Sequence, residues 1–350
     1  MSTSGSAVDA SAESQPGGFI HALARVPTPV IFVGAVGVAF ALLWQQGKLG
    51  EVGHAIRGAN VWVVIAGFVL YLIGMALASY RWHVLVVMAR GVSEFPKAAE
   101  AYLTSIVVNY AAPIGLAVPT RAALTKRALG LTAAETSAVA LWEVGVDVIV
   151  LGLGTVLWLL LGGWSRDVLP DVSRRTEVLA GAVVIAGAVA CLAGLAVVVS
   201  RKPSLVAKAR GMLYTFVTFP LRRPREAIYA TLITIAYWVI QGIVMILLLD
   251  ALGVDWSATL VLGMMSLPIL VGMLSPVPGG AGIREALMVG VARVHGADSA
   301  LVLLAAVSYR VALFISVPIL YSLVRMQLRA RARLAAAEGQ QRDSAVSRFS

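Results

Sequence analysis

The sequence predicts an all-α, polytopic membrane protein. Of its 350 residues, 59% are hydrophobic and 13% are charged, and the mean hydropathy is +0.87. A soluble globular domain carries about a quarter charged residues, so this composition excludes the soluble class. Several apolar runs approach or exceed the roughly 18–20 residues that a helix needs to cross the hydrocarbon core. The alternating segments of about ten residues that form transmembrane β-barrels are absent from the sequence.

Six full spans are expected, and two further apolar regions are irregular. Each irregular region, at residues 98–116 and 257–274, leads into a proline and glycine cluster and then into a short amphipathic helix, at 121–129 or 283–295. Neither short helix is long enough to span. Non-helical backbone is tolerated at membrane depth only where it is buried in protein or lines a polar cavity, so these regions are expected to be re-entrant half-helix pairs. The six spans are predicted at residues 29–44, 61–80, 134–161, 178–199, 227–249 and 299–324.

The distribution of charge predicts the topology. The connection from Ser200 to Arg225 carries seven basic residues and no acidic one, so it is expected on the cytoplasmic side, close to anionic inner-leaflet headgroups. The turn around Asp250 has two aspartates and no base, so it is expected outside. This alternation places both termini in the cytoplasm and the protein in the plasma membrane. The expected divisions are a disordered tail at 1–26, a transmembrane domain at 27–325 and a basic tail at 326–350.

The two irregular regions resemble each other and indicate an inverted internal repeat. Aligning Pro113 with Pro278 brings Glu143 near Arg310. Both copies have a half-helix, a break with proline, a short helix with arginine and a long span with a buried charge. Because the first pair starts from the cytoplasmic side and the second from outside, the copies have opposite topology, as in many secondary transporters. The copies are predicted at residues 98–161 and 257–324.

The stretch SPVPGGAGIREA, from Ser275 to Ala286, contains the strongest candidate site. A helix beginning at Ile283 directs its free N–H groups and positive dipole end at the break, which suits an anionic group such as phosphate. The glycines there favour either close approach to a ligand or a tight helix crossing. Arg284, and Arg121 in the first copy, are candidates for clamping a phosphate; for Arg121, a role as a cytoplasmic topology anchor is an equal alternative.

Three charged residues fall deep inside predicted spans. Glu143 and Asp147 are one turn apart on the third span, and Arg310 lies inside the last. Buried charges in a membrane face a cavity or a partner, so we predict a Glu143–Arg310 or Asp147–Arg310 pair, with either a structural or a transport role. The candidate residues for substrate binding and translocation are Asn109, Pro113, Arg121, Glu143, Asp147, Pro278, Gly279, Gly280, Gly282, Arg284, Glu285 and Arg310.

Other function classes find little support in the sequence. Its four histidines have no metal-ligand spacing, and it contains no P-loop, dinucleotide-binding or HExxH motif. The excess of basic residues is explained by topology and anionic lipid, so no nucleic-acid partner is expected. We therefore expect no cofactor, no metal and no catalytic role.

Several of these motifs resemble a known family. The stretch SPVPGGAGIREA, the later SYR, the first-copy stretch NYAAPIGLAVPTRAALTKRALGL and the acidic ALWEVGVD are similar to the transmembrane region of lysylphosphatidylglycerol synthases and to related stand-alone flippase-like proteins. Two positions depart from the family pattern: Ala117-Val118 in the first loop, and Val144 after Glu143. The chain also ends soon after its last span, so the resemblance implies the lipid-translocating part without the synthase domain.

The resulting expectation is a flippase-like transporter of an amphiphile with a polar or phosphate-bearing headgroup. Two alternatives stay open: an integral-membrane transferase acting on a lipid-linked substrate, and an accessory membrane subunit of a lipid-modifying enzyme. Membrane lipid is the expected partner, along with either a second copy of the chain or such an enzyme.

Overall fold

The computed structural model describes residues 57–111, 117–161, 216–275 and 280–346, together with residues 54, 211 and 214. Side chains are described within these ranges except at 107–111, 117–122, 133, 335 and 339–346. All the elements bounded there are helices, and the described residues include no strand, which confirms the all-α class for this part of the chain. The expected spans at 29–44 and 178–199 lie outside the described residues.

Among the described helices, four are long and apolar enough to cross a membrane, and they match four of the predicted spans. Two of them are longer than predicted, because a helix continues through a charged residue that ends an apolar run when that residue has a partner or meets solvent. The helix predicted to end at Tyr80 therefore continues to Arg90, and the helix predicted to end at residue 324 continues to Val346. The four are α4 (Val61–Arg90), α7 (Ala133–Leu160), α10 (Pro224–Ala251) and α13 (Ser299–Val346).

Local sequence explains where these helices begin and end. The Asn60 side chain accepts a hydrogen bond from the backbone N–H of Trp62 at the start of α4 (3.0 Å), and Gly91 ends that helix in the left-handed conformation. At the start of α7, Thr132 and Glu135 form a reciprocal capping box. Polar residues thus fix the helix ends, and the apolar sequence between them gives the length to span.

Short-helix pairs form in both predicted regions, but in the first region the first helix ends at Ala111 instead of residue 116, and the second begins at Ala117 instead of residue 121. The first consists of α5 (Phe95–Ala111) and α6 (Ala117–Leu129), and the second of α11 (Ala258–Leu274) and α12 (Ile283–Val294); the members of each pair pack against each other. In the second pair, the backbone at Gly280 has φ +63° and lies against Gly272 of α11. A Cβ at Gly280 would lie 2.7 Å from the Gly272 Cα. Of the two roles that the sequence left open for the glycines, tight crossing is the one seen at Gly280.

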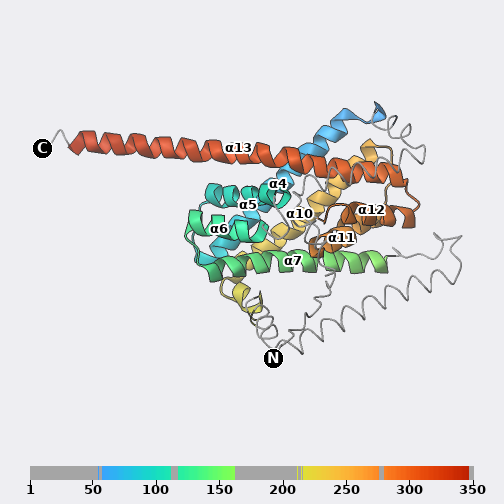
Figure 1. Ribbon diagram of the computed structural model, residues 1–350, viewed down its shortest axis with the longest axis horizontal. Helices are drawn as coiled ribbons and strands as arrows, with labels where there is room; N and C mark the ends of the chain where they lie inside the picture. The colour runs from blue at the N-terminus through green and yellow to red at the C-terminus, as the bar shows by residue number, and fades with distance from the viewer. Residues whose placement is uncertain are drawn as a thin grey trace, which may run out of the picture.

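The helices pack around a central antiparallel pair. Gly67 of α4 faces Leu247 of α10, while Arg81, farther along α4, bonds to Thr234, nearer the start of α10. Figure 1 shows these two helices crossing between α13 on one side and α7 on the other, with α5 and α6 toward one end and α11 and α12 toward the other.

Contacts among the first four described helices have counterparts among the last four. α4 packs on α5, and α10 on α11; α6 packs on α7, and α12 on α13. Across the two sets, α5 packs on α13 and α11 on α7. We call α4 to α7 the first unit and α10 to α13 the second unit.

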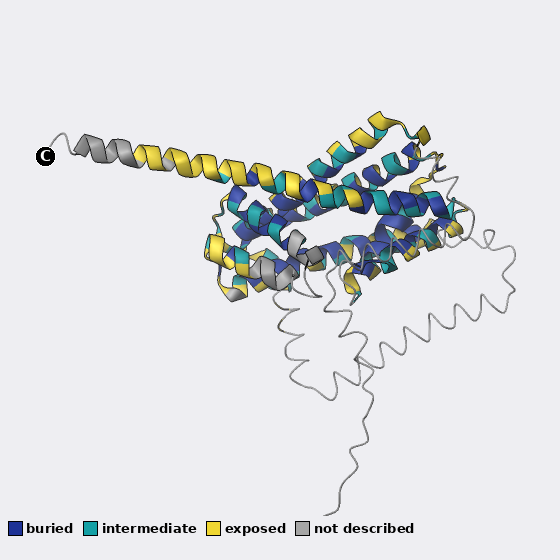
Figure 2. Cartoon of the chain, turned by 45° about the horizontal axis from the view of Figure 1, so that its top comes forward, coloured by how far each residue is buried: buried dark blue, intermediate teal, exposed yellow. Residues whose placement is uncertain are grey.

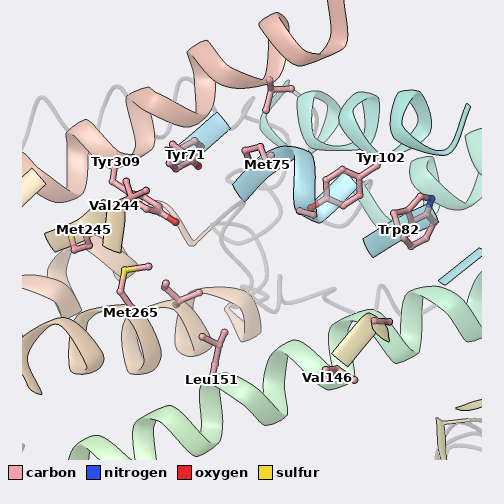
Figure 3. Packing of buried hydrophobic residues seen from close by; sticks show 14 of the residues in the cluster. Tyr71, Met75, Trp82, Tyr102, Val146, Leu151, Val244, Met245, Met265 and Tyr309 are labelled. Carbon is pink, nitrogen blue, oxygen red and sulfur yellow. The ribbon is translucent and has the colours of Figure 1, made fainter. Parts of the chain in front are cut away.

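Aromatic and sulfur-containing side chains fill the space between the units. Figure 3 shows Tyr71 of α4 next to Tyr309 of α13, with Met265 of α11 and Leu151 of α7 on the other side of the core. The Tyr71 and Tyr309 rings meet edge-to-face with centroids 5.2 Å apart. Figure 2 shows burial concentrated in this body, while the C-terminal part of α13 projects from it as an exposed helix. The core therefore lies among the spans.

Candidate functional site

A buried arginine on α4 connects three helices. Arg81 is 4% exposed, and its Nη1 donates to Asp147 Oδ1 of α7 (2.7 Å) and to Thr234 Oγ1 of α10 (3.2 Å). Its Nη2 donates to Glu143 Oε1 (2.8 Å) and Asp147 Oδ2 (3.1 Å). Charge-assisted bonds of this kind are the strong ones, so this group holds α4, α7 and α10 together. We call Arg81, Glu143, Asp147 and Thr234 the Arg81 cluster.

Aromatic residues of α10 complete the surroundings of the Arg81 cluster. Trp238 Nε1 donates to Asp147 Oδ1 (3.0 Å), and the Arg81 guanidinium carbon lies 5.9 Å from the centre of the Tyr237 ring. Asp147 therefore accepts bonds from both α4 and α10. Such a multiply bonded buried network is rigid, because each member loses a partner if another moves.

This geometry corrects the predicted ion pair. The sequence predicted Arg310 as the partner of Glu143 or Asp147, whereas the structure gives that position to Arg81. Arg81 was missed because it directly follows the predicted end of the span at Tyr80. The helix carries it back into the bundle, where Glu143 and Asp147, one turn apart on α7, both face it.

Arg310 lies instead beside the start of α12. Its Nη1 is 3.2 Å from Glu285 Oε1, and both residues are buried, at 4% and 8% exposure. The other carboxylate oxygen, Glu285 Oε2, accepts a hydrogen bond from the Gly282 N–H (2.7 Å). Glu285 thus caps α12 and faces Arg310 at once, and its negative charge lies at the positive end of the helix dipole.

Next to this pair, a polar chain leads back to α10. The Arg284 guanidinium lies over the Tyr309 ring, 5.1 Å from its centre, and the Tyr309 hydroxyl donates to Gln241 Oε1 (2.8 Å). Gln241 is completely buried. The Tyr309 ring also contacts Tyr71, so α4, α10, α12 and α13 meet here. We call Arg284, Glu285, Arg310, Tyr309 and Gln241 the Arg310 cluster.

One face of α10 joins the two clusters. Thr234 contributes to the first and Gln241 to the second, with Trp238 between them. Seven residues of α-helix span about 10 Å, so the clusters are separated by roughly two helical turns. Arg81, Glu143, Asp147 and Arg310 lie inside helices long enough to span, and ionisable residues at such positions are candidates for a functional site in membrane proteins.

The remaining predicted site residues are distributed as follows. Asn109 lies in the last turn of α5 and Arg121 near the start of α6, with side chains outside the described set. Most of the basic connection from Ser200 to Arg225 also falls outside it. Among the described residues, no group of three or more His, Cys, Asp or Glu side chains is placed to hold a metal ion. Pro113, Pro278 and Gly279 lie outside the described residues.

Sequence reasoning missed three participants besides Arg81. Thr234 and Gln241 are single polar residues in the apolar run of α10, where only their spacing carried a signal, and Tyr309 directly precedes Arg310 on α13. Thr234, Trp238 and Gln241 follow one another by four and then three positions, which is the spacing of one helix face. The indole N–H of Trp238 bonds to Asp147.

Comparison with protein families identifies the chain. The family model described as "Lysylphosphatidylglycerol synthase TM region" matches residues 30–320. The chain belongs to this family. Its match covers both clusters and all eight bounded helices except the end of α13. This confirms the resemblance and supports a membrane protein of the lipid-synthase or flippase type; a comparison with curated proteins gives no match.

Within the lysylphosphatidylglycerol synthase transmembrane family, this chain's two departures fall in different settings. Ala117 and Val118 begin α6. Val144 is 39% exposed on α7, directly after the buried Glu143. An apolar side chain at 144 therefore lies on the outer face of α7, away from the Arg81 cluster.

Proposed function

We propose that this protein is a flippase-like transporter that moves an amphiphile with a polar or phosphate-bearing headgroup between the leaflets of the plasma membrane. The observation that carries the proposal is the pair of ionic clusters inside a bundle of spanning helices, joined by one polar face of α10. Charged groups at this depth are costly unless they face a partner or a water-filled path. Membership of a lipid-synthase family supports lipid as the substrate.

The architecture that we infer is an inverted repeat of two four-helix units. The matching contacts of the two units support it, as do the equal lengths of α5 and α11, 17 residues each. The antiparallel contact of α4 with α10, the first helix of each unit, fits units of opposite topology. In this arrangement each short-helix pair is re-entrant, and rocking of one unit against the other gives alternating access.

The orientation that we infer places the basic end of the bundle in the cytoplasm. Arg90 at the end of α4 bonds to the carbonyl of Leu129, and Arg325 pairs with Glu100 (2.8 Å) at the same end. The opposite end carries Asp250 in the last turn of α10 and Asp255 and Asp298 in the connections that follow. An excess of basic residues on one side sets orientation during insertion, so both termini are assigned to the cytoplasm.

The substrate headgroup is assigned to the Arg310 cluster. Arg310 and Arg284 supply positive charge, and the start of α12 adds its dipole. Glu285 competes for Arg310, so a phosphate that reaches Arg310 displaces a carboxylate and is displaced by it in turn. This exchange lets the site bind a headgroup without trapping it. Glu143 and Asp147 lie on the cytoplasmic side of that site, while the role predicted for Arg121 concerns a side chain outside the described set.

Reconstitution tests the proposal. Purified protein in vesicles should accelerate leaflet exchange of fluorescent phosphatidylglycerol, and Glu285→Ala or Arg310→Ala should abolish the acceleration while leaving membrane insertion intact. Arg293→Ala is the matched control, because Arg293 is an exposed base on the same α12 helix. Wild-type exchange rates in either site variant would contradict a transport role. Product formation from a lipid-linked substrate without leaflet exchange would favour the transferase.

A further inference from the structure

The Gln241 side chain has an unused hydrogen-bonding group at the centre of the bundle. Its exposure is 0%, and its Oε1 accepts from the Tyr309 hydroxyl. Its Nε2 has no hydrogen-bond partner among the described residues. A buried polar group without a partner is costly, and native proteins keep few of them. Gln241 therefore requires an explanation beyond packing.

The amide of Gln241 packs directly against a glycine of the neighbouring helix. Gly74 of α4 faces it, and a Cβ at that position would lie 2.9 Å from Gln241 Nε2 and 3.2 Å from Ile240 Cγ2. A larger residue at 74 would push the amide aside. Gly74 and Gln241 together keep a donor at a fixed place where α4 and α10 cross.

A second buried donor lies farther along the contact between α4 and α10. Arg81 Nε also has no hydrogen-bond partner among the described residues. Arg81 follows Gly74 by seven residues on α4, or about 10 Å of helix. Both unused groups are N–H donors, so the contact between α4 and α10 can donate hydrogen bonds to oxygen atoms of a ligand. Near Gln241, the Arg284 guanidinium over the Tyr309 ring adds positive charge.

We propose that the Gln241 amide donates a hydrogen bond to a phosphoryl oxygen of the transported lipid, between the Arg310 and Arg81 clusters. This inference rests on the proposed function and deepens it: the substrate class is a phospholipid whose phosphate is recognised by hydrogen bonding as well as by charge. A neutral diacylglycerol lacks the phosphoryl oxygens and is not bound. Gln241 is then a specificity-determining residue.

The test is a binding measurement on the purified full chain in detergent. Dihexanoyl-phosphatidylglycerol should raise the melting temperature of the wild-type protein, whereas dihexanoylglycerol should not, and inorganic phosphate should do so more weakly than the phospholipid. Loss of one bond to a charged oxygen lowers affinity about tenfold or more, so Gln241→Leu should need at least about ten times more phosphatidylglycerol for the same shift. Gly74→Ala, which displaces the amide without removing it, should act in the same direction.

Val239→Leu on α10 is the matched control, since Val239 is 57% exposed on the outer face of the same helix; it should behave as wild type. Gln241→Leu removes the Nε2 that has no partner and also the oxygen that accepts from the Tyr309 hydroxyl, so each ligand-induced shift is measured from that variant's own melting temperature without ligand. Equal phosphatidylglycerol affinity in wild type and Gln241→Leu would overturn the inference, as would an equal response to the two lipids or a response to inorganic phosphate as strong as to the phospholipid.

Leaflet exchange separates this inference from the proposed function. Binding that depends on Gln241 without any leaflet exchange by the wild type would overturn transport and support the phosphate contact. Normal leaflet exchange by the wild type, together with phosphatidylglycerol binding that Gln241→Leu leaves unchanged, would overturn only the contact between Gln241 and the phosphate.

Discussion

The Arg81 cluster and the Arg310 cluster are both buried ionic groups of the same bundle, yet they are built differently. In the first, one guanidinium makes four bonds to two carboxylates and a hydroxyl on two other helices. In the second, Glu285 divides its two oxygens between Arg310 and the start of its own helix. The first is a multiply bonded tie. In the second, the contact between Arg310 and Glu285 is one that we propose a ligand replaces.

This difference indicates which cluster is expected to serve stability and which to serve transport. When one member of a buried hydrogen-bond network that joins three helices is substituted, the other members lose their partners too. A carboxylate that already caps a helix keeps that role when its charged partner leaves. We therefore expect changes at Arg81 to act mainly on folding and changes at Glu285 mainly on exchange.

Arg81→Met should give the largest loss of stability. It leaves Glu143 and Asp147 buried without their cation, and removing one partner of a buried ion pair costs about 3–5 kcal/mol. The measurement is the melting temperature of purified protein in detergent. Combining Arg81→Met with Glu143→Gln and Asp147→Asn should recover much of the loss, because no uncompensated charge then remains. If Arg81→Met alone were as stable as wild type, the Arg81 cluster would not be what holds the three helices together.

Gly280→Ala should give the next largest effect, near the Arg310 cluster. A left-handed backbone conformation costs a non-glycine residue about 1–2 kcal/mol, and the added Cβ would also meet the Gly272 backbone. Gly253→Ala is the control, because Gly253 has a similar φ of +70° with no atom within 4 Å of the added Cβ. Thermal melts should show Gly280→Ala losing clearly more stability than Gly253→Ala. Equal losses would argue against the tight crossing of α11 and the chain leading into α12.

Acidification should have the smallest effect, outside both clusters. Trp158 Nε1 donates to His295 Nε2 (3.0 Å), which requires a neutral imidazole. Burial lowers the pKa of His295 below its ordinary value of 6.5, so the unfolded chain takes up this proton at higher pH than the folded protein. The stabilisation that neutral His295 gives to the folded protein is complete above pH 6.5 and declines as the pH falls below that value. The loss is less than about 1 kcal/mol, because the group is partly exposed. His295→Gln keeps an acceptor and should flatten this part of the melting profile; an unchanged profile would remove His295 as the cause.

The sequence predicted the parts of this account that follow from periodicity and length. Apolar runs located α4, α7, α10 and α13, and proline and glycine clusters located the breaks before α6 and α12. The partner of Glu143 was predicted wrongly, because helix pairing decides it. Nothing local shows that Arg81 on α4 turns toward α7, whereas Glu285, three residues after Gly282, was recognisable as a residue at the start of a helix. Single polar residues such as Gln241 acquire meaning only when α4 and α10 are placed together.

The central claim is that the Arg310 cluster carries transport while the Arg81 cluster holds the bundle. Leaflet exchange of fluorescent phosphatidylglycerol by Glu285→Gln, measured per folded molecule in reconstituted vesicles, tests it most directly. Glutamine still accepts the Gly282 N–H but no longer competes for Arg310 by charge, so the headgroup is held and not released. The account predicts a folded protein that melts well above Arg81→Met and exchanges lipid at least about tenfold more slowly than wild type. Exchange at the wild-type rate would contradict it.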